Sequence, residues 1–214
     1  MGLDYSYVLR FRREQLKEIL LAVVERSKPN PDPPVEVILP GSEGKIFMPF
    51  YVLPKAMNPV SFEGSHPPIF CTSPWLEPDE PLERYAAVQV AEGHPLPRDT
   101  EGRIAFGGVW LSMNSFYSKP GQETPNVEFL DFSFTPAYKQ MSMLFAASES
   151  VRRFFVQLLE EHNGISGKFE DSDYGWGPIT IWPETAPDFN PENLLDLHNR
   201  LAPDIPYYRF PLGF

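Results

Sequence analysis

The residues best suited to chemistry lie together in one stretch, KFEDSDYGWGP, at positions 168–178. This stretch holds three carboxylates, Glu170, Asp171 and Asp173, beside three aromatic residues and two glycines. Carboxylate oxygens are the ligands that hard cations such as Ca²⁺ and Mg²⁺ prefer in proteins. The three carboxylates therefore make this stretch a candidate metal site.

The pattern of a calcium-binding loop does not fit this stretch. An EF-hand loop that began at Asp171 would need oxygen ligands at its fifth and twelfth positions and glycine at its sixth. Those positions hold Gly175, Trp182 and Trp176. Neighbouring carboxylates on one turn also lack the separate environments that divide an acid from a base. We therefore favour a hairpin turn with its glycines at positive φ, and keep the three-carboxylate metal site as the alternative.

Aromatic residues suggest a second kind of site, a pocket for a small molecule. A Pro-rich connection at 54–83 holds His66 and Trp75, and Tyr174 and Trp176 lie next to the carboxylates. Long connections without regular structure are often functional, and ligand pockets are lined mainly by apolar and aromatic side chains. These four residues would form a ligand site if the fold brings the two segments together.

The chain holds no motif for a known class of reaction. The GxSxG, P-loop, GxGxxG and HExxH patterns are all absent from the sequence. Cys71 lies among apolar residues and is predicted to be a small core residue, with a nucleophile as the alternative. We expect a binding protein with no catalytic residue and no cofactor; a hydrolase that uses scattered carboxylates and histidines is the weaker alternative.

The negative charge is explained by solubility, and an acidic face for a basic protein partner is the alternative. The formal net charge is −11 at pH 7, and residues 1–60 carry eight Lys or Arg against seven Asp or Glu, so the negative excess lies after residue 60. An acidic surface repels phosphate groups, which disfavours nucleic acid, and it complements a basic protein. We therefore expect a protein-interaction role, such as an immunity-type inhibitor that masks a basic partner.

Cysteine use and hydropathy indicate the compartment. One cysteine in 214 residues excludes an internal disulfide and is typical of a reducing compartment. The first residues, MGLDYSYVLRFRREQ, lack the apolar core of a signal peptide. No apolar run approaches the roughly 18 residues that a membrane helix needs. The expectation is a cytoplasmic protein without a membrane segment.

Two amphipathic helices are expected from the 3.6-residue period. In 13–27 the apolar face holds Leu16, Ile19, Leu20, Val23 and Val24. In 148–164 it holds Val151, Phe154, Phe155, Leu158, Leu159 and His162. A shorter helix is predicted to start at Asn190, since Asn is a good N-cap and proline at the next position fits a first turn.

Strand patterns fill most of the remaining chain. Alternation and β-branched or aromatic residues predict strands at 4–11, 35–39, 45–53, 84–92, 102–117, 126–136, 165–170 and 177–183. We predict one α+β domain over 1–214, with a mostly antiparallel sheet of six to eight strands and two main helices on one face. The Pro-rich connection at 54–83 is expected to be irregular. The short C-terminal helix and an extended aromatic tail form a strap at 184–214.

Three stretches carry a resemblance to a known family. They are MGLDYSY, EGRIAFGGVWLSM and EFLDFSFTPAYKQMSMLFAASESVRRFFVQLLEEHNG. Together they resemble a family of uncharacterised bacterial proteins, and the resemblance does not extend to the Pro-rich middle or to the last ~30 residues. It implies a bacterial cytoplasmic protein and carries no activity or site residue.

If 168–178 is a turn, Asp171→Asn combined with Asp173→Asn should change the free energy of unfolding by less than about 0.5 kcal/mol, because solvated turn carboxylates contribute little. Chemical denaturation measures this change, and calorimetric titration with Ca²⁺ measures metal binding. A large loss of stability, or Ca²⁺ binding that the double variant abolishes, would show that the stretch is a metal site.

Overall fold

The computed structural model describes residues 5–30, 33–40, 44–53, 59–62, 68–113, 128–171 and 178–190, with the side chains of Lys139, Gln140 and Asp171 left out. Within these residues, four α-helices pack with a seven-stranded antiparallel sheet and two smaller sheets. The predicted α+β class is confirmed. None of the described helices is long and apolar enough to cross a bilayer.

The main sheet has the strand order β12-β11-β1-β10-β9-β6-β4. Its strands are β1 (Tyr5–Arg12), β4 (Tyr51–Leu53), β6 (Ile69–Thr72), β9 (Val109–Met113), β10 (Phe129–Pro136), β11 (Ser166–Asp171) and β12 (Ile179–Trp182). The long strands β1 and β10 lie in the middle and pair with Leu9 opposite Phe132. Strands far apart in the sequence are therefore neighbours at the centre of the molecule.

Alternation along β1 and β10 sends the core side chains to one face of the sheet. The buried residues are Tyr5, Tyr7, Leu9 and Phe11 in β1 and Leu130, Phe132 and Phe134 in β10. On the opposite face, Arg10 forms two hydrogen bonds with Asp131 across the strands, at 2.7 and 2.8 Å. The alternation predicted for 126–136 is confirmed in the part of it that forms β10.

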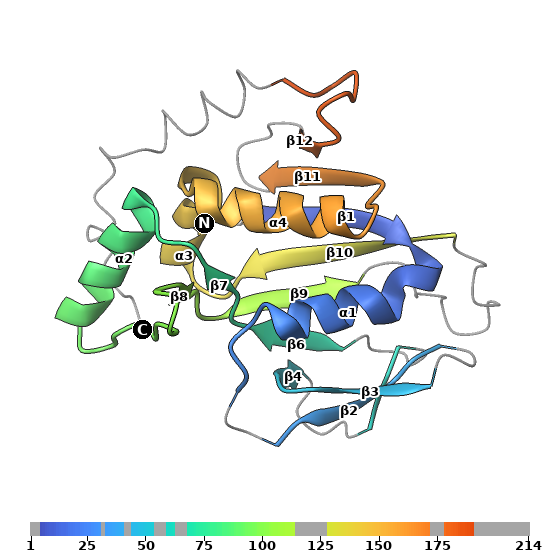
Figure 1. The fold of residues 1–214 in the computed structure, drawn as a ribbon, viewed down its shortest axis with the longest axis horizontal. Coiled ribbons are helices and arrows are strands. Elements are labelled where there is room, and N and C mark those ends of the chain that lie inside the picture. Colours follow the sequence, from blue (N-terminus) through green and yellow to red (C-terminus); the bar gives the residue numbers. More distant parts are fainter. Residues whose placement is uncertain are drawn as a thin grey trace.

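The helices are α1 (Leu16–Glu25), preceded by a 3-10 turn (Arg13–Gln15), α2 (Glu80–Ala91), α3 (Lys139–Ala147) and α4 (Glu149–Glu161). Three of them cover the apolar face, whereas α2 packs on α3 beyond the end of the sheet. Figure 1 shows α1 and α4, the two predicted helices, lying across the same face of the sheet. Tyr7 joins this layer to the sheet: its hydroxyl donates to the Phe145 carbonyl oxygen at 2.8 Å, and its ring stacks on Phe155.

The helix α4 forms where the sequence predicts it. Ser148 is its N-cap and accepts a hydrogen bond from the Val151 amide at 3.1 Å. The apolar stripe from Val151 to Leu159 is buried. Asn163 ends the helix at φ +50°, the left-handed conformation expected there.

The strand predicted at 84–92 is wrong, because these residues lie in α2. Asp79 caps the helix, and Pro81 lies in the first turn, where its missing N–H costs no hydrogen bond. Leu82, Tyr85 and Ala86 are buried at helical spacing. The β-branched Val88 and Val90 suggested a strand, but the cap and the 3.6-residue spacing decide the local structure. The helix α3 was not expected at all.

Two other predicted strands are broken in the structure. The segment 45–53 divides at Pro49–Phe50 into two strands, β3 (Lys45–Met48) and β4. The strand β4 belongs to the main sheet, whereas β3 forms a small sheet with β2 (Val35–Ile38) and β5 (Val60–Ser61). The segment 102–117 divides into β8 (Ile104–Ala105) and β9. Gly108 lies between them at φ +69°, and a Cβ there would stand 3.1 Å from Ala137. The break therefore requires glycine.

The Pro-rich connection at 54–83 is more ordered than expected. It holds β5, β6, β7 (Trp75–Leu76) and the start of α2, and β7 pairs with β8. At the other end of the chain, β11 and β12 pair antiparallel, as strands flanking a hairpin should. The predicted C-terminal helix and most of the strap at 184–214 lie outside the described residues.

Candidate binding surfaces

One carboxylate joins the first turns of two helices. The Oδ1 atom of Asp79 accepts a hydrogen bond from the Leu82 amide in α2, at 3.0 Å. Its Oδ2 atom accepts from the Ser148 hydroxyl at 2.7 Å and from the Ser150 amide at 2.9 Å, both at the start of α4. The first turn of a helix carries unsatisfied N–H groups and a partial positive charge. Asp79 therefore caps α2 and α4 at once.

The residues before Asp79 connect these two helices to the end of α1. The Trp75 amide donates to the Arg26 carbonyl oxygen, and the Lys28 amide donates to the Ser73 carbonyl oxygen, both at 2.8 Å. On its other side Trp75 pairs with Ala105 in β8. Three segments distant in the sequence thus meet around β7.

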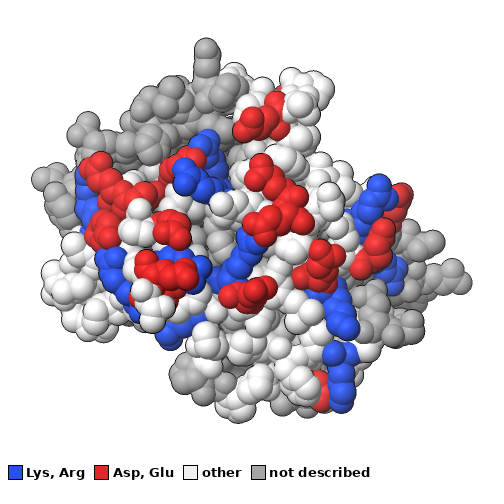
Figure 2. All heavy atoms as spheres, in the orientation of Figure 1, with Lys and Arg blue, Asp and Glu red and all other residues white. Residues whose placement is uncertain are grey.

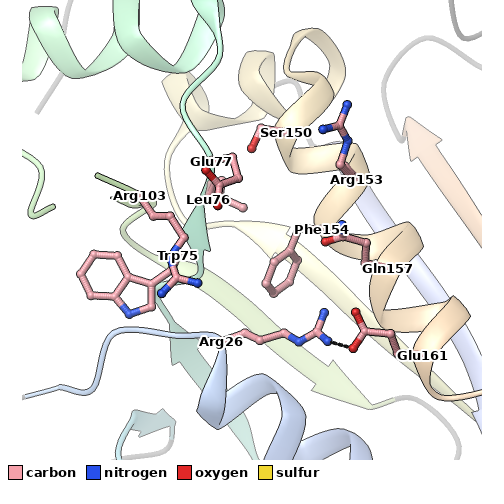
Figure 3. A pocket seen from close by; sticks show the side chains of 10 residues that line it. All are labelled: Arg26, Trp75, Leu76, Glu77, Arg103, Ser150, Arg153, Phe154, Gln157 and Glu161. Atoms are coloured by element: carbon pink, nitrogen blue, oxygen red, sulfur yellow. Dashed lines mark hydrogen bonds and ion pairs between the residues drawn. The ribbon is translucent and has the colours of Figure 1, made fainter. Parts of the chain in front are cut away.

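A cavity of about 350 Å³ opens where these segments meet. Its apolar part consists of Trp75, Leu76 and Phe154, and its cationic part of Arg26, Arg103 and Arg153. Figure 3 shows Arg26 and Arg103 on two sides of the Phe154 ring, with Arg153 farther along α4. We call this cavity the arginine pocket.

Each arginine of the pocket has a carboxylate neighbour. Arg26 is ion-paired with Glu161, which ties the end of α1 to α4. Arg103 contacts Asp99 at 2.7 Å and Glu101 at 3.2 Å. The hydrogen bond that Arg103 donates to the Asp99 carboxylate is the main cause that raises the pKa of Arg103. Arg153 is the least satisfied, since its contact with Glu149 is 4.0 Å long.

A second surface lies on α2 and the following loop. Segment 77–103 carries seven carboxylates and three arginines, a net charge of −4 at pH 7. Figure 2 shows acidic side chains on the left of the molecule, where α2 lies in Figure 1, with Lys and Arg side chains between them. We call this surface the acidic face and define it by its exposed glutamates Glu80, Glu83, Glu92 and Glu101.

The arginines of segment 77–103 are all held within the chain. Arg84 contacts Glu80 at 2.7 Å, Arg98 contacts Glu83 at 2.6 Å, and Arg103 contacts Asp99 and Glu101. An apolar strip runs between the glutamates, because Ala87 and Val90 follow Glu83 at helical spacing. Val90 is 61% exposed. The acidic face thus has an apolar centre and a charged margin.

Of the predicted ligand-site residues, the structure places Trp75 at the wall of the arginine pocket. His66, Tyr174 and Trp176 lie outside the described residues, so their meeting with Trp75 stays a prediction. Of the predicted metal ligands, Glu170 is exposed in β11, opposite Ser6 of β1. The side chain of Asp171 and all of Asp173 lie outside the described part.

In the part of the chain that the structure describes, no three His, Cys, Asp or Glu side chains are grouped to hold a metal ion. Cys71 is half-buried in β6, and burial raises the pKa of its thiol. A raised pKa lowers the fraction of nucleophilic thiolate. His162 lies with Nδ1 2.6 Å from Oε1 of Glu18, a contact between α4 and α1 rather than a ligand position.

The arginines of the pocket were not predicted as site residues. None of the three arginines lies in a recognisable sequence motif. The three residues belong to the end of α1, to the residue before β8, and to α4. Only their packing around β7 brings them together, so no spacing in the sequence signals the pocket.

Comparisons of the chain with protein-family models, with curated proteins and with solved structures found no match. The resemblance to a bacterial family therefore stays a prediction.

The ion pair between Arg98 and Glu83 should be measurable in the titration of Glu83. Hydrogen bonding from Arg98 lowers the pKa of Glu83 below its ordinary value of 4.5. We expect Arg98→Gln to return this pKa toward 4.5, measured by NMR of the Glu83 carboxyl carbon. A lowered pKa in the folded state means that the pair stabilises the fold above pH 4.5 and that this contribution is lost as the pH falls through the lowered value. An unchanged pKa in Arg98→Gln would contradict the pairing.

Proposed function

We propose that the protein is a non-enzymatic binding protein, an inhibitor of the immunity type, whose acidic face covers a basic surface of a protein partner. The observation that carries this proposal is the combination, in α2 and its flanking residues (77–103), of a net charge of −4 with arginines that are already paired inside the chain. Because those arginines are engaged, the uncompensated charge presented to a partner is negative.

The shape of the acidic face also favours a protein partner. Protein interfaces have an apolar, desolvated centre and a polar margin. Val90 and Ala87 provide an apolar centre on α2, and the glutamates provide the margin. Charge complementarity accelerates association and excludes wrong partners. The same charge repels nucleic acid and anionic lipid surfaces.

The test compares two variants that lose the same charge. Glu80→Gln with Glu92→Gln removes two negative charges from the acidic face, and Glu14→Gln with Glu25→Gln removes two from exposed positions near α1. Each tagged protein is expressed at its native level, captured, and analysed by quantitative mass spectrometry. We expect the wild type and the Glu14/Glu25 control to retain a stoichiometric basic protein, and the acidic-face variant to retain roughly tenfold less.

Salt dependence provides the second measurement. Recovery of the partner should fall as NaCl is raised, since salt screens attraction between exposed charges. An acidic partner, or equal recovery with the wild type and the acidic-face variant, would contradict the proposal.

A further inference from the structure

We infer that the outer face of the small sheet β3-β2-β5 is a contact surface between two copies of this chain, which form a weak dimer. The contact is isologous: the same face of each copy meets across a two-fold axis. It does not depend on the proposed function, because it does not involve the acidic face. Figure 1 shows β2 and β3 away from α2, so a dimer of this kind leaves both acidic faces open.

The small sheet has one buried face and one exposed face. Val37 of β2 and Ile46 and Met48 of β3 are buried in the core. Alternation sends their sequence neighbours to the other face. There Phe47 is 57% exposed and Ile38 is 41% exposed. Two large apolar side chains on adjacent strands thus stand in solvent on the same face, where a second surface would remove them from water.

The outer face carries a pattern that complements itself. In the antiparallel pairing of β2 and β3, Glu36 lies opposite Phe47 and Ile38 lies opposite Lys45. The two apolar residues therefore occupy one diagonal of the face, and the two charged residues occupy the other. A two-fold axis along the apolar diagonal brings Phe47 onto Phe47 of the second copy, Ile38 onto Ile38, and Lys45 onto Glu36. A single rotation thus matches the apolar groups and the opposite charges together.

The charge of this region permits self-association. The whole chain carries a net charge of −11 at pH 7, and like charge of this size opposes contact between copies. Segment 28–62, which contains all three strands of the small sheet, carries three lysines and three carboxylates, a net charge of zero. Figure 2 shows few charged side chains on the lower part of the molecule, where β2 and β3 lie in Figure 1.

The two charges of the face are compensated within one copy. Nζ of Lys45 lies 3.0 Å from Oε1 of Glu36. Across the two-fold axis the two ion pairs would lie antiparallel, so that each charge has opposite charges as its neighbours in both copies. Dimerisation therefore brings no excess charge together, and the apolar pair supplies the attraction.

The alternative is that Phe47 and Ile38 are simply solvated, as many exposed apolar residues are. A face centred on four residues is small, which places the dimer among weak contacts that exchange with the monomer. The two explanations differ in whether the mass of the particle depends on protein concentration.

Sedimentation velocity of the full chain tests this difference between roughly 1 and 500 µM, at constant ionic strength. We expect the wild type to shift from monomer toward dimer over this range, and Phe47→Ser to dimerise at least roughly tenfold more weakly. Leu21→Ser is the control, because Leu21 is a 44% exposed side chain on α1, and it should leave dimerisation unchanged. Circular dichroism checks that each variant is folded.

A wild type that stays monomeric to the highest concentration would overturn the inference, whether the face is then free or covered by a different protein. Equal dimerisation of Phe47→Ser and the wild type would also overturn it.

Exchange of the two charges tests the two-fold arrangement itself. Lys45→Glu alone and Glu36→Lys alone each set like charges against each other across the axis, so each should weaken the dimer. An equimolar mixture of the two single variants pairs opposite charges again and should form a mixed dimer at least as readily as the wild type. A mixture that associates no better than either variant alone would overturn the inference. Because partner capture is measured separately, failure here leaves the proposed function standing.

Discussion

The carboxylate of Asp79 is the interaction on which both candidate surfaces depend. It satisfies the first-turn amides of Leu82 in α2 and Ser150 in α4, two helices that are far apart in the sequence. A charged cap is favoured at a helix N-terminus by hydrogen bonding and by the helix dipole. Two helices that share one cap are held at a fixed distance at that point. The position of α2 therefore follows from α4, which is anchored to the sheet through its aromatic stripe.

This arrangement gives an acidic chain two surfaces of different character. The acidic face follows the exposed side of α2, where the charge comes from residues close in sequence. In the arginine pocket, three arginine side chains lie together: one at the end of α1, one just before β8 and one in α4. They meet because these segments pack around β7. The ion pairs of Arg98 and Arg103 hold the loop after α2 in place. Local sequence produces the first surface, whereas tertiary packing produces the second.

The difference between local and tertiary origin also explains which features the sequence predicts. The stripe from Val151 to Leu159 and the alternation of β10 are strong periodic signals, and both elements are found as expected. In the second half of α2 the exposed residues Ala87, Val90 and Ala91 are apolar, so this part has a weak helical period, and the cap at Asp79 decides its structure. Trp75 was a predicted site residue because of its type. Arg26 and Arg103 were not, since nothing near them in the sequence points to a cavity.

The most direct measurement of the central claim is native-state amide hydrogen exchange in Asp79→Ala. If one carboxylate caps both helices, the protection of the Leu82 and Ser150 amides should fall together, each by roughly fivefold, as expected for loss of a cap hydrogen bond of about 1 kcal/mol. Amides in the middle of β1 and β10 should lose no more protection than the change in the global free energy of unfolding accounts for. Loss of protection at only one of the two helices, or at neither, would contradict the account of Asp79 as a shared cap.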